Sequence, residues 1–255
     1  MSRIGAAFEG ARSQKRTALL GYAMGGDGDT AALLHAIDEA GADVIELGLP
    51  FSDPIADGPV LQAAAVRALS AGATLRGLLE LAGSLRLRAP VVAMGYMNPI
   101  ESMGLPAFAE AAARAGIAGV IIPDLPLEEA GPLRELLAAR GVDLVPLVAP
   151  TTGSARAAAI AKSARGFLYA VSVTGVTGAQ ARLPDDLAAR LRELRSISPV
   201  PVAVGFGIST PEQAKALRGL ADGVVVATAL VAAHHQGGAQ STARLVSALR
   251  AALTD

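Results

Sequence analysis

The chain has 255 residues, a formal net charge of −1 and a pI of about 6.3, so no basic surface for nucleic acid or an anionic membrane is expected. Hydrophobic residues make up 52% and aromatic residues only 3%, which supplies a large core but disfavours an aromatic-lined carbohydrate groove or a base-stacking platform. With no cysteine, three histidines and three lysines, the sequence excludes disulfides and thiolate chemistry and leaves catalysis mainly to Asp, Glu, Tyr, Ser, Thr and backbone amides.

Short apolar runs typical of strands alternate along the chain with helical stretches rich in Ala, Leu and Arg. An amphipathic stretch over 2–13 comes first and is expected to cover the bottom of the fold. The predicted strands follow at 17–22, 43–49, 91–96, 118–122, 143–148, 166–173, 200–205 and 222–228. Helices are predicted near 30–40, 60–70, 105–115, 128–139, 154–163, 185–195, 211–219 and 239–253.

Eight strands, each followed by a helix, predict an α/β fold of the (β/α)8 or TIM-barrel type with an extra N-terminal helix. No shift in composition marks a second domain, so residues 1–255 are expected to form one domain. The alternative is an open doubly wound sheet, but no GxGxxG motif follows the first predicted strand. In a (β/α)8 barrel the active site lies at the carboxyl ends of the strands, and candidate residues are sought there.

The mean hydropathy of +0.44 raises the question of a membrane segment. The longest uninterrupted apolar run, 223–233, has 11 residues, whereas a spanning helix needs roughly 20. Residues 1–16 mix charged and apolar side chains and lack the hydrophobic region of a signal peptide. We therefore expect a cytoplasmic protein without membrane contact.

A single glutamate interrupts the apolar strand predicted at 43–49. Alternation puts Glu46 on the face opposite the bulky Ile45 and Leu47, which should meet the helices, so Glu46 is expected to point into the barrel. A carboxylate there is costly unless it is paired or used, and no arginine lies within the other predicted strands. Desolvation would raise its pKa toward the range that is useful for proton transfer.

The loop that follows this strand, 50–59, carries three prolines and two aspartates, Asp53 and Asp57. The prolines restrict the loop, so either aspartate can be held over the mouth of the barrel. Two carboxylates in different environments can take separate acid and base roles. Glu46 and an aspartate of this loop are therefore the predicted acid–base pair.

Lysine and histidine are placed unfavourably for catalysis. No lysine lies within or directly after a predicted strand, which disfavours a Schiff-base aldolase. His35 falls in the middle of a predicted helix and is expected to be structural. His234 and His235 are expected to be solvated residues after the last strand.

Glycines and small residues gather after the last three predicted strands, at 174–179, 205–209 and 227–229, the last of which is expected to enter a short helical turn. Glycines let backbone N–H groups approach an anion, and a helix N-terminus adds favourable partial charge. Barrels often bind phosphate at the loops of strands seven and eight. The pattern favours a phosphorylated substrate that is held by amides rather than by Lys or Arg.

The motifs together resemble one family, the tryptophan synthase α subunits. The resemblance rests on Tyr169 and on the runs ELGLPFSDPIADGP at 46–59, MGYMNP at 94–99, PDLP at 123–126, GVTG at 175–178 and GFGIS at 205–209. The matches are colinear over almost the whole chain, and the longest of them is the most specific.

The resemblance implies a lyase of tryptophan biosynthesis that cleaves indole-3-glycerol phosphate to indole and glyceraldehyde 3-phosphate by a retro-aldol reaction. It implies that Glu46 is the general acid–base and that Asp57 holds the indole N–H. It further implies an indole pocket of Tyr22, Met94, Tyr96, Tyr169, Thr177 and Phe206. The phosphate site would consist of Gly178, Gly207, Ala227 and Thr228, with no metal.

The same resemblance implies a partner. The family's β subunit receives indole and carries pyridoxal phosphate, so an α2β2 heterotetramer is expected, with no cofactor in this chain. Loops 53–59 and 174–184 are the expected contacts, the second of them as a lid.

Two positions depart from the family pattern. Ala227-Thr228 replaces the usual Gly-Ser at the phosphate end, where the extra methyl group narrows the approach to the backbone. The first loop, 25–28, lacks the proline that is often found there, which predicts a more mobile loop.

Two other functions are weighed against the lyase. The first is an α-like scaffold or allosteric subunit with weak turnover of its own, which an assay of indole release with and without the β subunit would distinguish. The second is another phosphosugar barrel enzyme, such as an epimerase or isomerase. That class usually uses a metal cluster, or a Lys or His at the strand ends, and this sequence offers neither.

Overall fold

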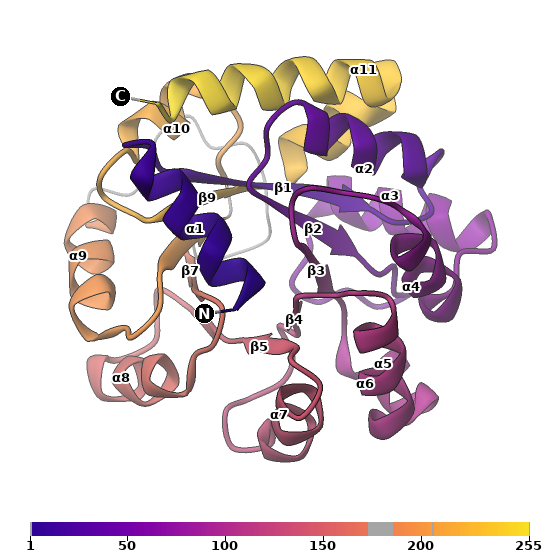
Figure 1. Cartoon of the computed structure of the whole chain (residues 1–255), viewed down its shortest axis with the longest axis horizontal. Coiled ribbons are helices and arrows are strands. Elements are labelled where there is room, and N and C mark those ends of the chain that lie inside the picture. Colours follow the sequence, from indigo (N-terminus) through magenta and orange to yellow (C-terminus); the bar gives the residue numbers. More distant parts are fainter. Residues whose placement is uncertain (1, 173–185, 206, 255) are drawn as a thin grey trace.

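The computed structural model describes residues 2–172, 186–205 and 207–254 as a barrel of parallel strands surrounded by helices (Figure 1). The strands are β1 (Ala18–Met24), β2 (Val44–Gly48), β3 (Val91–Met94), β4 (Gly119–Ile121), β5 (Asp143–Val145), β6 (Leu147–Val148), β7 (Leu168–Val171), β8 (Val202–Gly205) and β9 (Gly223–Val226). Their order is β5-β4-β3-β2-β1-β9-β8-β7-β6. The predicted (β/α)8 fold is thereby confirmed.

The strand predicted at 143–148 is divided in two by Pro146, which has no N–H to give to a ladder. Its first half, β5, pairs with β4, and its second half, β6, pairs with β7. The Tyr169 N–H donates to the Pro146 carbonyl oxygen at 3.0 Å, so the sheet continues across the break. One predicted strand therefore closes the barrel by pairing with a different neighbour at each end.

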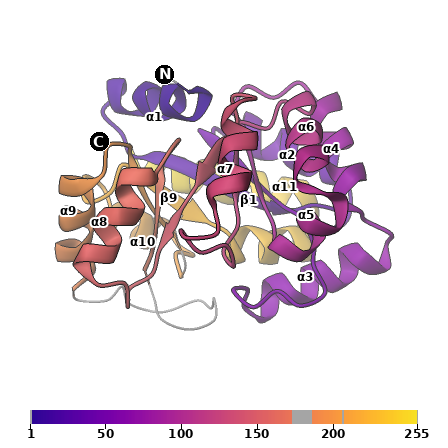
Figure 2. The ribbon, with the colours of Figure 1, turned by 90° about the horizontal axis from the view of Figure 1, so that it is seen from below.

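The helices form the outer layer, apart from the first (Figures 1 and 2). They are α1 (Arg3–Ser13), α2 (Thr30–Glu39), α3 (Pro59–Ser70), α4 (Leu75–Ser84), α5 (Met97–Met103), α6 (Leu105–Arg114), α7 (Gly131–Ala138), α8 (Ser154–Ser163), α9 (Leu187–Ile197), α10 (Pro211–Ala216) and α11 (Thr228–Ala252). No described helix has the length and apolar character that are needed to cross a membrane.

Three features of the helical layer differ from the sequence prediction. Helices α4 and α5 were not predicted, although the Thr74 side chain caps α4 through the Gly77 N–H in the usual way. Non-helical Gly237 and Gly238 divide the last helix into two segments, and the helix predicted at 239–253 is the second of them. The first segment, 228–236, continues the apolar run of β9 and is longer than the short helical turn that the sequence predicts there.

Two apolar clusters fill the molecule. One lies between the strands and the helices and includes Ile45 and Leu47 of β2. The other fills the barrel and includes Val44 of β2 together with Ile4 and Phe8 of α1. Figure 2 shows α1 across one end of the barrel, opposite the end at which α3 begins. The predicted alternation of β2 and the covering role of the N-terminal helix are both confirmed.

Candidate active site

Glu46 lies at the centre of β2 and faces the inside of the barrel. Its neighbours in the sheet are Tyr22 on β1 and Val92 on β3. The side chain is buried, with a relative exposure of 1%, and its Oε2 atom has no hydrogen-bond partner among the described residues. A buried carboxyl oxygen without a partner is costly in a folded protein, which is typical of a functional position.

Asp57 comes from the loop after β2 and is buried beside the N-terminus of α3. The loop is closed locally, since the Asp57 N–H donates to the Pro54 carbonyl at 3.1 Å and Gln62 Nε2 donates to the Asp57 carbonyl at 2.8 Å. Tyr96, which precedes α5, supports the same loop: its hydroxyl accepts from the Ala56 N–H at 3.2 Å and donates to the Asp57 carboxylate. Tyr96 thus holds both the backbone of the loop and the Asp57 carboxylate in position.

The second aspartate of the loop, Asp53, does not reach the site. Its side chain is exposed and accepts a hydrogen bond from Ser52 Oγ. Of the two aspartates that were weighed from the sequence, the structure brings only Asp57 into the barrel mouth with Glu46.

The two buried carboxyl groups differ in their affinity for a proton. Burial and, as the smaller cause, the nearby charge of Asp57 together raise the pKa of Glu46 from its ordinary value of 4.5 to about 8. Burial also raises the pKa of Asp57, to about 6, against the opposing hydrogen bond from Tyr96. At pH 7 the site therefore contains a protonated Glu46 beside an ionised Asp57, which are an acid and an anion within one apolar cavity.

A small cavity contains both groups and most of the predicted site. It is lined by Tyr22, Glu46, Asp57, Leu61, Met94, Tyr169, Gly207, Ile208, Val225, Ala227 and Thr228. Tyr96 is the one described residue of the predicted set that does not line it. Thr177, Gly178, Phe206 and the loop 174–184 lie outside the described residues.

Sequence reasoning missed the apolar lining residues Leu61, Ile208 and Val225. For Val225 the signal was available, because it lies two residues before Ala227 and the alternation of β9 directs it inward. Leu61 is on α3 and reaches the cavity only because the loop brings the helix over the barrel, which no local pattern reveals.

Two glycines let the tyrosines of the cavity lie against the backbone. A Cβ atom at Gly48 would lie 1.9 Å from Tyr22 Oη, and one at Gly205 would lie 2.2 Å from Tyr169 Oη. Burial raises the pKa of both phenols well above its ordinary value, so the two tyrosines are neutral polar walls at physiological pH.

The far end of the cavity is formed by backbone rather than by cations. Thr228 is the first residue of α11, and no side chain caps this helix at Ala227. Gly207, with a φ of +84°, lines the same end. Free N–H groups at a helix N-terminus carry partial positive charge and suit an anion. No Lys or Arg side chain from the described residues lines the cavity.

The prediction that both His234 and His235 are solvated is wrong for His234. The Nε2 atom of its half-buried ring lies 2.8 Å from the Asp27 carbonyl oxygen, whereas His235 is exposed. The cause is the early start of α11, which turns His234 inward on the first helical segment.

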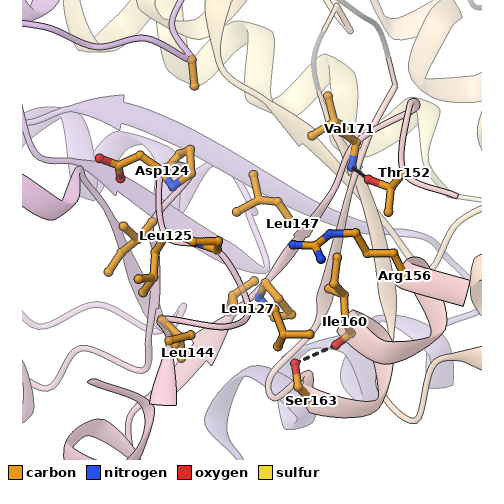
Figure 3. A pocket seen from close by; sticks show the side chains of 18 of the residues that line it. Asp124, Leu125, Leu127, Leu144, Leu147, Thr152, Arg156, Ile160, Ser163 and Val171 are labelled. Carbon is orange, nitrogen blue, oxygen red and sulfur yellow. Dashed lines mark hydrogen bonds between the residues drawn. The ribbon is translucent and has the colours of Figure 1, made fainter. Parts of the chain in front are cut away.

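A larger cavity of about 780 Å³ lies between α7 and α8 and is separate from the carboxylate pair (Figure 3). Its walls include four leucines and four prolines, and Arg156 at its side pairs with Glu128 at 2.8 and 3.0 Å. Asp124 of the PDLP run lies at its edge and accepts from the Met97 N–H at the start of α5. Asp124 is thus engaged in capping a helix, and neither Glu46 nor Asp57 lines this larger cavity.

Comparison with known proteins identifies close relatives. The family described as tryptophan synthase alpha chain matches residues 8–253. The tryptophan synthase alpha chain of Synechococcus elongatus is 48% identical over 99% of this chain and 97% of its own length. That of Gluconacetobacter diazotrophicus is 50% identical over 91% of this chain and 87% of its own length. A structure of Mycobacterium tuberculosis tryptophan synthase superimposes with a TM-score of 0.93 at 36% identity, over 100% of this chain and 99% of that one.

Proposed function

The chain belongs to the tryptophan synthase alpha chain family, and we propose that it cleaves indole-3-glycerol phosphate to indole and glyceraldehyde 3-phosphate. The observation that carries the proposal is the pair of unlike carboxyl groups, with Glu46 protonated and Asp57 ionised in one buried cavity. A retro-aldol cleavage needs a proton donor for the leaving carbon and a stabiliser for the positive ring that results. The pair supplies both.

Glu46 acts as the general acid and then as the base. Its proton goes to C3 of the indole ring, and the ring nitrogen takes up the positive charge. The resulting carboxylate accepts the proton of the hydroxyl on the adjacent glycerol carbon. As that C–O bond becomes a carbonyl, the C3–carbon bond breaks and its electron pair returns to the ring. Indole and the aldehyde are formed, and Glu46 ends protonated, as it began.

Asp57 stabilises the positive charge that develops on the indole ring during the reaction. Its ionised carboxylate accepts a hydrogen bond from the indole N–H, which becomes more acidic and more positive once C3 is protonated. The interaction is therefore stronger in the transition state than in the bound substrate, which is the condition for lowering the barrier. Tyr96 contributes by holding this carboxylate in place.

The remaining lining residues bind the two ends of the substrate. Tyr22, Met94 and Tyr169, with Thr177 and Phe206, are proposed to enclose the indole ring. Gly178, Gly207, Ala227 and Thr228 are proposed to hold the phosphate through amide N–H groups at the start of α11. No cofactor is required in this chain, because a carboxyl group carries out both proton transfers of the proposed reaction.

The pH dependence of kcat/KM tests this assignment of protons. Activity should rise as Asp57 ionises, with an acidic limb near pH 6, and should fall as Glu46 loses its proton, with a basic limb near pH 8. Initial rates of indole release between pH 5 and pH 9 measure both limbs. An activity that keeps rising to pH 9 would mean that Glu46 works as the carboxylate and that the roles are wrong.

Replacing Ala227 by glycine should tighten phosphate binding. The methyl group of Ala227 lines the cavity beside Thr228, where an anion must approach the backbone closely. Calorimetry with glycerol 3-phosphate should give a several-fold lower dissociation constant for Ala227→Gly. Ala229→Gly, one residue beyond Thr228 and outside the cavity lining, is the control for the loss of helix stability. Equal dissociation constants in Ala227→Gly and the unmodified protein would show that the methyl group is harmless.

The family implies a β-subunit partner, and we propose that it docks at loop 53–59 and loop 174–184 in an α2β2 complex. Exposed apolar side chains support the proposal that the partner docks at loop 53–59. Ile55, at its tip, has a relative exposure of 76%, and the other large exposed apolar residues of the described chain follow on α3: Val60, Val66 and Leu69. An apolar surface of this kind is typical of an interface. Pyridoxal phosphate belongs to that partner, and the complex is proposed to be cytoplasmic.

A second candidate function is an α-like allosteric or scaffold subunit with weak turnover of its own. The same exposed segment favours it, because loop 53–59 leads directly into Asp57 and a partner on the loop would act on the catalytic group. Indole release should be measured from the isolated chain and from the chain mixed with a β subunit. Turnover that stays weak even in the mixture would support the allosteric subunit, whereas substantial turnover in either sample supports the lyase.

A further inference from the structure

The loop between β1 and α2 is held by side chains although its sequence predicts mobility. The run 25–28 contains three glycines, and two of them, Gly26 and Gly28, have φ values of +87° and +81°. The Asp27 carboxylate is nearly buried and accepts two hydrogen bonds from Arg67 on α3, at 2.7 and 2.6 Å. A bidentate pair of this kind fixes both position and orientation.

The second attachment of this loop comes from His234. Its Nε2 atom lies 2.8 Å from the Asp27 carbonyl oxygen. A carbonyl oxygen only accepts, so Nε2 carries the hydrogen and donates it. A Cβ atom at Gly28 would lie 3.1 Å from this nitrogen, so glycine lets the ring approach the loop closely. The Nδ1 atom is buried and has no hydrogen-bond partner among the described residues.

Asp27 thereby joins the two helices that carry the ends of the proposed site. Helix α3 begins two residues after Asp57, and it contacts Asp27 through Arg67. Helix α11 begins at Thr228, and it contacts Asp27 through His234. The apolar faces of the two helices also share one cluster, in which Val231 of α11 lies with Leu61, Ala64, Ala65 and Ala68 of α3.

We propose that His234 is a positioning residue that holds the first segment of α11, and with it the N–H groups at Thr228, in place relative to the loop 50–59 that carries Asp57. The inference rests on the proposed binding of phosphate at Thr228. His234 lies somewhat less than two helical turns from that residue, and beyond it the helix breaks at Gly237 and Gly238. The segment 228–236 is therefore a short helix that is attached to β9 at one end and, near the other end, to Asp27 through His234.

A residue with this role affects binding more than chemistry. Glu46 lies within a strand that is paired on both sides, so loosening α11 leaves the acid–base group in place. The phosphate, in contrast, is held by the helix that His234 anchors. Loss of the anchor should raise KM roughly fivefold to tenfold, as for the loss of one hydrogen bond, and should leave kcat almost unchanged.

The test compares three substitutions at His234 with one at its neighbour. His234→Ala removes the donor. His234→Gln keeps an amide N–H at the reach of Nε2, and His234→Asn keeps an amide that is too short to reach Asp27. His235→Ala, on the next and exposed residue, is the control. The readouts are kcat and KM for indole-3-glycerol phosphate, the dissociation constant of glycerol 3-phosphate by calorimetry, and amide hydrogen exchange of 25–28 and 228–236.

We expect the Ala and Asn variants to raise KM and the dissociation constant and to speed exchange in both segments, while the Gln and His235→Ala variants behave as the unmodified protein. Equal exchange and equal phosphate affinity in all four variants would overturn the inference, as would a loss confined to kcat. The exchange measurement needs no substrate, so it judges the role of His234 even in a chain that releases no indole. Absent turnover of the unmodified chain would count against the proposed lyase function alone.

Discussion

Replacing Glu46 by glutamine should abolish indole release and leave the barrel folded. Glutamine has the same shape and cannot exchange a proton, so the loss measures acid–base catalysis directly. A positioned acid–base group contributes about 10²–10⁴-fold, and a decrease of that size in kcat is expected. Glu39→Gln, at the exposed end of α2, is the matched control. If Glu46→Gln retains more than about a tenth of the turnover, Glu46 is not the acid–base.

The same substitution should stabilise the protein, and the gain should depend on pH. The folded pKa of Glu46, about 8, is raised above the ordinary value of 4.5, so the folded chain holds this proton more tightly than the unfolded chain. The contribution of Glu46 to stability is therefore complete below pH 4.5 and is lost as the pH rises toward 8. Glutamine does not ionise, so the unfolding free energy of Glu46→Gln should exceed that of the unmodified protein by on the order of 3–5 kcal/mol at pH 8, and much less at pH 4.

Urea unfolding at the two pH values measures this difference. A variant that is inactive and also more stable would identify Glu46 as a residue kept for chemistry at the expense of the fold. An inactive variant that is less stable at both pH values would instead assign the lost turnover to a damaged barrel.

Replacing Asp57 by asparagine should cost about 2–4 kcal/mol of transition-state stabilisation, which is the scale for losing one preorganised electrostatic group. Asparagine can still accept a hydrogen bond from the indole N–H but carries no charge to balance the protonated ring. The loss should therefore appear mainly in kcat. Asp53→Asn, in the same loop and exposed, is the control. A change in KM alone would contradict the charge-stabilising role.

Asp57→Asn should also change the pH profile. The charge of Asp57 is the second cause of the raised pKa of Glu46, after burial. Without that charge the pKa of Glu46 falls, so the basic limb of the residual activity should move below pH 8. An unmoved limb would mean that the two carboxyl groups are electrostatically independent.

The parts of the fold that follow local rules were predictable from the sequence. The inward orientation of Glu46 follows from alternation with Ile45 and Leu47, and the covering position of α1 follows from its amphipathic pattern. The division of the predicted strand 143–148 depends on which neighbours it meets on either side of Pro146, and this is a property of the closed barrel. A single-strand pattern contains no such information.

The same distinction separates the parts of the site. The sequence pattern singles out Glu46, as a charged residue in an apolar strand, and the proline-rich loop that carries Asp53 and Asp57, whereas the choice of Asp57 comes from the family resemblance. The supporting contacts were not found. The hydrogen bond of Tyr96 to Asp57 and that of His234 to Asp27 join segments that are distant in the chain, and only the assembled structure brings them together.

The most direct measurement is a crystal structure of the chain with an uncleavable analogue of indole-3-glycerol phosphate. We expect the indole ring between Tyr22 and Tyr169, its N–H on Asp57, Glu46 beside C3, and the phosphate at the N–H groups that begin with Thr228. A ring bound outside the small cavity, or an Asp57 carboxylate without contact to the indole N–H, would contradict it.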